Sequence, residues 1–176
     1  MKFNKRDHIW YVCYGSNMLN ERFLCYLKGG AFRECSNVLP ACEDNADDPL
    51  QRMPYILPYN MYYANTSSSW NGSAVSFLDI TKPGCAYGAA YLISKKQFRH
   101  VCRGENGGHD PENASWYNAV VSLGTFDGID VATLTNSRRL DRRSPSYNYL
   151  EVLVEGIMEN YSYIDNAEAW EYVKSC

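Results

Sequence analysis

The order of hydrophobic and polar positions divides the chain into short strands and a few amphipathic helices. Residues 9–14 form a continuous β-branched and aromatic run, which predicts a strand buried on both faces. Residues 15–17 (Gly-Ser-Asn) end that run, and residues 19–27 then repeat apolar side chains at helical spacing up to a Gly-Gly pair. The chain is therefore predicted to open with a strand, a tight polar turn and a helix.

The rest of the chain predicts more strands than helices. Strands are expected at 55–64, 74–80, 86–93, 116–123 and 129–134. Helices are expected at 95–103 with Ser94 as the cap, from Pro145 to 159, and from Asp165. Residues 31–54 have no clear period and contain an acidic run, so we expect an exposed loop there. The strands do not alternate regularly with helices, which disfavours a Rossmann fold. We predict one α+β domain over residues 1–176, with a mixed, mostly antiparallel sheet curled into a small barrel and helices packed outside.

Composition and charge limit the partners. The 176 residues are 45% hydrophobic with a formal net charge of −3, which gives no overall attraction to nucleic acid or anionic membranes. No apolar run approaches the ~20 residues of a membrane-spanning helix, and no secretion signal is recognised, so we expect a cytoplasmic protein acting as a monomer or homodimer. Four arginines within residues 138–143 leave nucleic-acid or phosphate binding as an alternative, beside an ordinary surface loop or a clamp for an acidic substrate.

Cysteine and histidine give little sign of metal chemistry. The chain has seven cysteines but no Cys-x-x-Cys pair, and its three histidines do not fall at zinc-ligand spacing. Reduced thiols packed as small apolar side chains are the favoured interpretation. We therefore predict no metal and no cofactor.

Four segments could carry chemistry. The turn at 14–17 presents backbone N–H groups and short polar side chains before a helix, which suits a carboxylate or an oxyanion, although a capped turn can be purely structural. Glu105 follows a helix and would serve as a general base if buried, but its residue type alone favours the surface. Residues 69–74 and 144–147 each place an aromatic ring beside small polar residues, as pocket rims and simple turns both do.

Taken in order, these segments are similar to one family. The run Tyr14-Gly15-Ser16-Asn17-Met18 at the end of the first strand resembles the opening of the gamma-glutamylcyclotransferase family, which includes the AIG2-like proteins. The resemblance continues through Trp70–Ala74, the strand Tyr87–Ile93, Glu105, and Ser144–Tyr147 with Leu150, Leu153 and Gly156. It spans residues 12 to about 160. The chain departs from the family pattern at Asn106, where a glycine usually follows the glutamate, and in the loops 31–54 and 137–144.

The resemblance implies an activity and a set of site residues. Family members release 5-oxoproline from gamma-glutamyl compounds through attack of the glutamyl α-amine on the γ-carbonyl, without a cofactor. Glu105 would be the catalytic acid and base, and the substrate would be bound by Tyr14, Gly15, Ser16, Asn17, Trp70 and Tyr147. Whether the leaving group is an amino acid or an amine is open. The alternative is a non-catalytic protein of the same fold that binds a small molecule or peptide, which would have no use for a buried glutamate.

Overall fold

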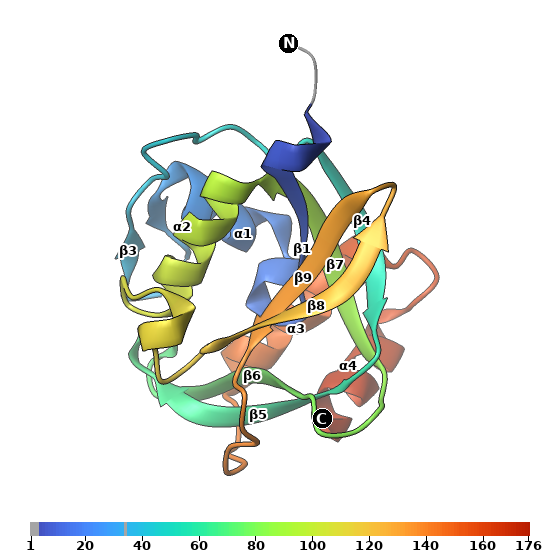
Figure 1. Ribbon diagram of the computed structural model, residues 1–176. Helices are drawn as coiled ribbons and strands as arrows, with labels where there is room; N and C mark the ends of the chain where they lie inside the picture. The colour runs from blue at the N-terminus through green and yellow to red at the C-terminus, as the bar shows by residue number, and fades with distance from the viewer. Residues whose placement is uncertain (1–3, 34) are drawn as a thin grey trace.

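A computed structural model describes residues 4–33 and 35–176, and a five-stranded sheet lies at its centre (Figure 1). The strands lie in the order β4 (Gln51–Leu57), β7 (Ala86–Ser94), β1 (His8–Cys13), β9 (Ile129–Thr135) and β8 (Ala119–Phe126). β1 is the middle strand, and five of its six residues are buried. Its continuous apolar sequence is what a strand needs when both faces are covered.

The sheet is mixed and mostly antiparallel, as the sequence predicts. β1 runs antiparallel to β7 and parallel to β9, and the outer pairs β4–β7 and β8–β9 are antiparallel. The predicted barrel is wrong, because the two outer strands β4 and β8 do not pair with each other and the sheet is not closed.

The strand predicted over 55–64 is two strands in different sheets. β4 ends at Leu57, and β5 (Asn60–Ser67) pairs instead with β6 (Ser73–Asp79) to form a separate hairpin. β4 also begins inside the predicted loop 31–54, where Pro54 and polar neighbours hide the strand pattern. Proline is tolerated there because β4 is an edge strand, and an edge strand has one row of unpaired N–H positions.

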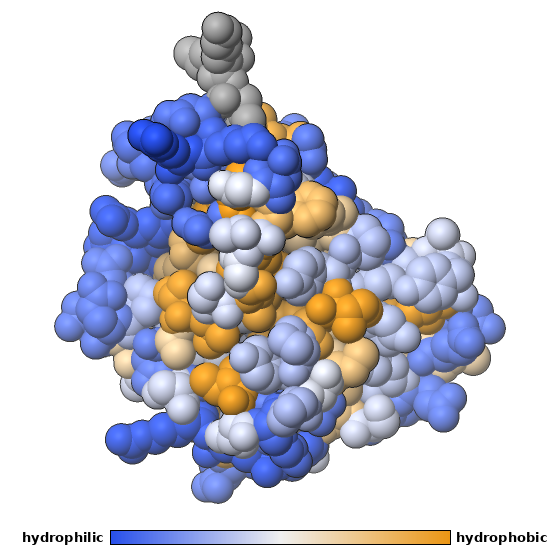
Figure 2. All heavy atoms as spheres, turned by 45° about the vertical axis from the view of Figure 1, so that its right-hand side comes forward, coloured by the Kyte–Doolittle hydropathy of each residue, from blue (hydrophilic) through white to orange (hydrophobic). Residues whose placement is uncertain are grey.

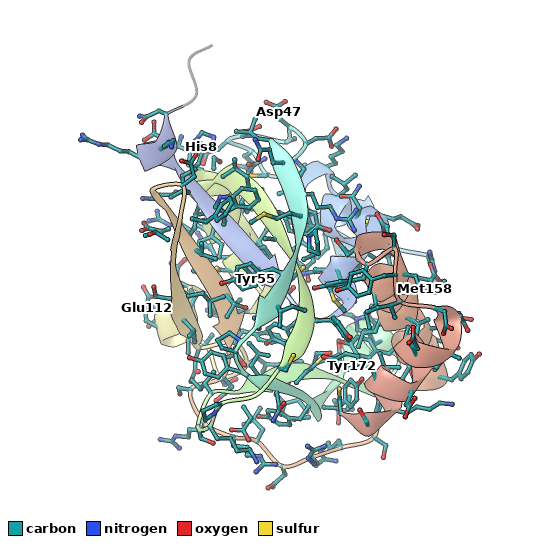
Figure 3. The ribbon with its side chains drawn as sticks, turned by 90° about the vertical axis from the view of Figure 1, so that its right-hand side faces the viewer. His8, Asp47, Tyr55, Glu112, Met158 and Tyr172 are labelled. Atoms are coloured by element: carbon teal, nitrogen blue, oxygen red, sulfur yellow. The ribbon has the colours of Figure 1, made fainter. Side chains whose placement is uncertain are left out.

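Within the described residues, four α-helices pack around the strands: α1 (Asn20–Lys28), α2 (Lys95–Glu105), α3 (Tyr147–Asn160) and α4 (Asn166–Ser175). α1 and α2 contact each other beside β1, and α3 packs on α4 (Figure 1). Figure 3 shows α3 and α4 beside β4 and β7. The shorter elements are the 3-10 helices η1 (Lys5–Asp7), η2 (Ser16–Met18), η3 (Ser68–Trp70) and η4 (Pro111–Asn113), and the strands β2 (Gly30–Ala31) and β3 (Val38–Leu39).

Tyrosine hydroxyls join elements that are far apart in the sequence. The Tyr161 hydroxyl donates to the carbonyl oxygens of Tyr55 and Gly88, which ties the end of α3 to both β4 and β7. Tyr172 of α4, labelled in Figure 3, accepts a hydrogen bond from the backbone N–H of Tyr87. A tyrosine can bury its ring and still satisfy its hydroxyl, so a chain with 15 tyrosines can place many of them inside.

The outer strands expose part of their apolar surface. Ile56 of β4 and Val120 and Phe126 of β8 are exposed. Figure 2 shows apolar side chains in the middle of one face, with hydrophilic residues around them. In the described part of the chain, none of the helices combines the length and the apolar character needed to cross a membrane.

Candidate functional site

A cavity of about 710 Å³ opens where the end of β1, η2, the end of α2, the β5–β6 hairpin and α3 come together. This volume falls in the ~300–1,000 Å³ range of small-molecule sites. The residues that line it and that carry the argument below are Asn17, Arg22, Trp70, Ser76, Glu105 and Tyr149. They come from segments spread over more than a hundred residues of sequence.

The turn after β1 forms one wall of the cavity and is held rigidly. The Tyr14 hydroxyl donates to the carbonyl of Leu134 at 2.8 Å, so this side chain forms part of the wall and is already bonded. Gly15 lies against its neighbours: a Cβ there would be 3.2 Å from both the Ser76 Cβ and the Tyr149 hydroxyl oxygen. The 3-10 turn that follows leaves the backbone N–H groups of its first residues outside its own hydrogen bonds, near the cavity.

Glu105 is the last residue of α2, and its carboxyl group lies at the cavity between the turn and α1. The Asn17 Nδ2 donates to the Glu105 Oε1 at 2.6 Å, and Tyr26 of α1 hydrogen-bonds to the same carboxyl. Burial raises the pKa of Glu105 above its usual range, while the positive charge of Arg22 and the hydrogen bonds from Tyr26 and Asn17 lower it by less. A carboxyl group with a raised pKa can take up and return a proton closer to neutral pH than an exposed one.

The local sequence explains why α2 ends at this point. Ser94 and Gln97 form a capping box that fixes the first turn of the helix, as the predicted cap at Ser94 requires. At the other end, Gly104 allows α2 to contact α1 closely, since a Cβ at this position would be 2.9 Å from two ring carbons of Tyr26. The same contact places the Tyr26 hydroxyl beside Glu105.

Comparison with known proteins shows which solved structures share this fold. No protein-family model matches the chain. Three solved structures each superpose on it with 17–18% sequence identity: a gamma-glutamyl cyclotransferase (TM-score 0.64, 96% of this chain and 87% of that one), an uncharacterized protein from Homo sapiens (TM-score 0.64, 94% and 87%), and YkqA from Bacillus subtilis (TM-score 0.60, 96% and 54%). The chain has the gamma-glutamylcyclotransferase fold. At this identity the likeness establishes the fold, and the site must be argued from its own residues.

One curated sequence is also similar. It is histone deacetylase 5 from Arabidopsis thaliana, which is 26% identical over 203 aligned residues. The alignment covers 94% of this chain but 30% of that protein. The chain thus spans less than a third of the relative it matches.

Asn106, the departure from the gamma-glutamylcyclotransferase pattern, has a structural role. Its Nδ2 donates to the carbonyls of Cys102 and Tyr117, each at 3.0 Å, and its Oδ1 accepts from the Tyr117 N–H at 2.9 Å. The side chain therefore caps α2 and anchors the segment that carries the Tyr117 ring to the cavity. Its φ of −116° is open to any residue, so a glycine is not needed here.

The predicted aromatic residues divide into those that reach the cavity and one that does not. Trp70 lines it, with its ring 4.9 Å from that of Tyr149 in an edge-to-face contact. The prediction for Tyr147 is not matched: this side chain is 64% exposed and stacks on Trp170 instead. Ser146 caps α3, so Tyr147 is the first helical residue and points outward, whereas the residue two further on points in.

Tyr149 lines the cavity instead of Tyr147, the residue that the family resemblance implies. Its hydroxyl donates to the Ser76 Oγ and accepts from the Ser76 N–H, both at 3.0 Å. Burial raises the pKa of Tyr149 to about 12, so the hydroxyl stays protonated. The signal was present in the sequence, since residues 149 and 153 share the inner face of the predicted helix at a spacing of four.

Other cavity residues were not predicted at all. Arg22 and Tyr26 lie four residues apart on α1 and so share one helical face, and Tyr11 and Tyr117 add two more rings. Spacing along α1 could have paired the first two, but only the tertiary fold brings them to Glu105. Among the described residues, no group of three or more His, Cys, Asp or Glu side chains could hold a metal ion.

The arginine-rich segment 138–143 lies elsewhere. Arg139 pairs with Asp79 at 3.4 Å, and Arg142 donates to the carbonyl of Cys176. Within the described part of the chain, the residues lining the cavity include none of these arginines. The structure therefore gives no support to their use as a clamp for a ligand in this cavity.

Proposed function

We propose that the protein is a cyclotransferase that releases 5-oxoproline from a gamma-glutamyl amino acid or a gamma-glutamylamine. The observation that carries the proposal is the carboxyl group of Glu105, which lies in a large polar cavity with a raised pKa and a fixed orientation. The fold supports the same conclusion, because it is the fold of a gamma-glutamyl cyclotransferase.

The reaction needs a base and then an acid. The α-amine of the glutamyl group, whose pKa is near ~8, is mostly protonated at neutral pH and cannot attack. Glu105 takes a proton from this amine, and the freed nitrogen attacks the γ-carbonyl carbon. The new carbon–nitrogen bond closes the five-membered ring, and Glu105 gives its proton to the leaving amine as the old amide bond breaks. The ring nitrogen then loses its second ammonium proton to the released amine or to water, which leaves the neutral lactam. The raised pKa of Glu105 lies closer to the pKa of the α-amine than that of an ordinary glutamate. This smaller pKa difference favours the transfer of the proton from the amine to Glu105.

The turn and the aromatic walls hold the substrate in the folded conformation. In this mechanism the backbone N–H groups of the turn at Ser16 and Asn17 would stabilise the negative oxygen that develops on the γ-carbonyl, together with the Tyr149 hydroxyl to which Ser16 bonds. Trp70 and Tyr149, whose rings meet edge to face, would restrict the substrate from the wall that they form together. Because the nucleophile belongs to the substrate, correct folding of the substrate can provide part of the ~7–11 kcal/mol available to well-oriented intramolecular reactions.

The alternative function, binding without turnover, predicts a different position for Glu105. A binding protein gains nothing from a glutamate whose charged form is disfavoured by burial, so this side chain would be expected in solvent. Here the carboxyl is hydrogen-bonded to Asn17, in the turn that would hold the substrate. This contact favours the enzyme over the binding protein.

The test is an assay for 5-oxoproline over a panel of gamma-glutamyl compounds. The panel would contain gamma-glutamyl amino acids, gamma-glutamylamines and gamma-glutamyl peptides, with the purified protein at several concentrations. We expect product from at least one compound at a rate proportional to protein concentration. Binding of panel compounds by calorimetry without any 5-oxoproline would contradict the proposal and favour the binding function.

A further inference from the structure

Arg22 is a buried cation that the proposed mechanism does not use. It belongs to α1, is 5% exposed, and lines the cavity. Three aromatic rings surround its guanidinium group, with centroids at 5.0 Å (Tyr26), 5.6 Å (Phe32) and 5.9 Å (Trp70). Flat rings on several sides fix the plane of the guanidinium group, and a fixed plane is suited to binding a carboxylate with two parallel hydrogen bonds.

The hydrogen-bonding capacity of Arg22 is largely unused. Its Nη2 donates weakly to the Tyr26 hydroxyl at 3.4 Å, and its Nε is buried with no partner. No described carboxylate forms an ion pair with it, although nine other Lys or Arg pairs with carboxylates occur in the described chain. Burying an unpaired guanidinium costs several kcal/mol, so a binding partner from outside the chain is the simplest explanation for its position.

Arg22 remains positively charged in the cavity. Burial lowers the pKa of Arg22, but the neighbouring groups, first Tyr26 and Glu105 and then Cys35 and Cys25, together raise it by more, and the net shift is upward. Arg22 is not within ion-pair distance of Glu105, and the Tyr26 hydroxyl lies between them, bonded to both. The cation is therefore free to bind a second anionic group close to the catalytic carboxyl.

The positions of these groups match the charges of one substrate class. Glu105 is held on one side by Asn17, from the turn that begins the 3-10 helix η2, and on the other side by Tyr26, which contacts Arg22. Two features that attract anions thus flank one base. A gamma-glutamyl amino acid has two carboxylates, one at each end, whereas a gamma-glutamylamine has a carboxylate only on the glutamyl end.

We propose that Arg22 binds the carboxylate of the leaving amino acid and makes the enzyme selective for gamma-glutamyl amino acids over gamma-glutamylamines. This inference rests on the proposed function. The carboxylate would accept hydrogen bonds from the guanidinium group, which is held by the rings of Phe32 and Trp70. The amide nitrogen of the leaving amino acid would then face Glu105. No bond at the reacting atoms involves Arg22, so it determines specificity and has no part in the chemical step.

The test compares two substrates that differ only in this carboxylate: gamma-glutamylalanine and gamma-glutamylethylamine. The wild-type protein should have the higher kcat/KM for gamma-glutamylalanine. Arg22→Gln should lower kcat/KM for gamma-glutamylalanine by ~10–100-fold, mainly through KM, because it removes charge-assisted hydrogen bonds. The value for gamma-glutamylethylamine should change by less than ~3-fold, apart from a shift in pH dependence. Arg22→Lys, which keeps the charge but loses the fork, should restore part of the preference.

The pH profile separates specificity from simple electrostatics. Arg22 lowers the pKa of Glu105, so Arg22→Gln should move the acidic limb of kcat/KM to higher pH for both substrates alike. The substrate comparison is therefore made on the pH-independent plateau. Circular dichroism and thermal melting of both variants would show that they fold.

Several results would overturn this inference. Equal losses on both substrates at the plateau would mean that Arg22 does not read the leaving group. A wild-type enzyme without preference between the two compounds would refute it before any variant is made. If neither compound yields 5-oxoproline, the proposed function fails, and calorimetry tests the inference separately. Wild-type protein that binds gamma-glutamylalanine more tightly than gamma-glutamylethylamine, with the difference lost in Arg22→Gln, would support a carboxylate site at Arg22. Equal binding of the two compounds would contradict it.

Discussion

Asn106 offers a quantitative test of how the cavity wall is anchored. Replacing it by alanine removes three hydrogen bonds, two of which connect the end of α2 to the backbone of Tyr117 across an intervening loop. Each bond contributes ~1 kcal/mol net, and the Tyr117 N–H and carbonyl would lose partners in a partly buried position. We therefore expect Asn106→Ala to lower the free energy of unfolding by ~2–3 kcal/mol. Asn106→Gly should cost a further ~0.5–1 kcal/mol through backbone entropy.

The measurement is urea unfolding followed by tryptophan fluorescence. For a chain of this length the change corresponds to a fall in Tm of ~4–12 °C. Asn113→Ala in the same loop is the matched control, since Asn113 is exposed, and its change should stay within ~0.5 kcal/mol. An Asn106→Ala protein as stable as wild type would refute the anchoring role. An Asn106→Gly protein more active than wild type would mean that this departure from the family pattern impairs the site.

Four further substitutions test other parts of the site. Gly104→Ala should push the Tyr26 ring away from Glu105 and lower kcat/KM by ~10-fold or more, whereas unchanged kinetics would show that this close contact is dispensable. Tyr149→Phe should lower both activity and stability, because it removes the hydroxyl that bonds to Ser76. Tyr147→Phe, at the exposed position, should keep kcat/KM within ~2-fold of the wild-type value, and the reverse pattern would support the assignment of Tyr147 to the site. Glu105→Gln should gain stability relative to wild type in urea unfolding as the pH rises above 4.5, the ordinary pKa of a glutamate. The raised folded-state pKa of Glu105 gives the wild type stability that is present at low pH and lost as the pH rises through that pKa, and a constant difference between the two proteins would contradict it.

The sequence is sufficient to predict elements whose burial leaves a continuous or periodic pattern. The apolar run of β1 and the Ser94 cap of α2 are of this kind, and the structure places them as predicted. β4 was missed because an edge strand tolerates Pro54 and needs no apolar alternation. The closed barrel was predicted from strand number, but closure depends on pairing between edges, which no local pattern encodes.

The site was predictable only in part, and for different reasons at each residue. Residue type alone favoured a surface position for Glu105, and the family resemblance placed it in the site, at the cavity where the structure also has it. The motif 144–147 points to Tyr147, but Ser146 caps α3 and so sets the helical phase that turns Tyr147 outward and Tyr149 inward. Arg22 carries no local signal, since a buried cation is recognised only when its surroundings are known.

The central claim is that the carboxyl group of Glu105 moves the proton that allows the substrate to cyclise. The most direct measurement is the rate of 5-oxoproline release by Glu105→Gln beside wild type, on the same gamma-glutamyl substrate, with binding followed by calorimetry. Glutamine keeps the size of the side chain and an oxygen for the Asn17 hydrogen bond but cannot accept the proton. We predict unchanged substrate binding with turnover lower by ~10²-fold or more. A Glu105→Gln protein that turns over like wild type would contradict the account.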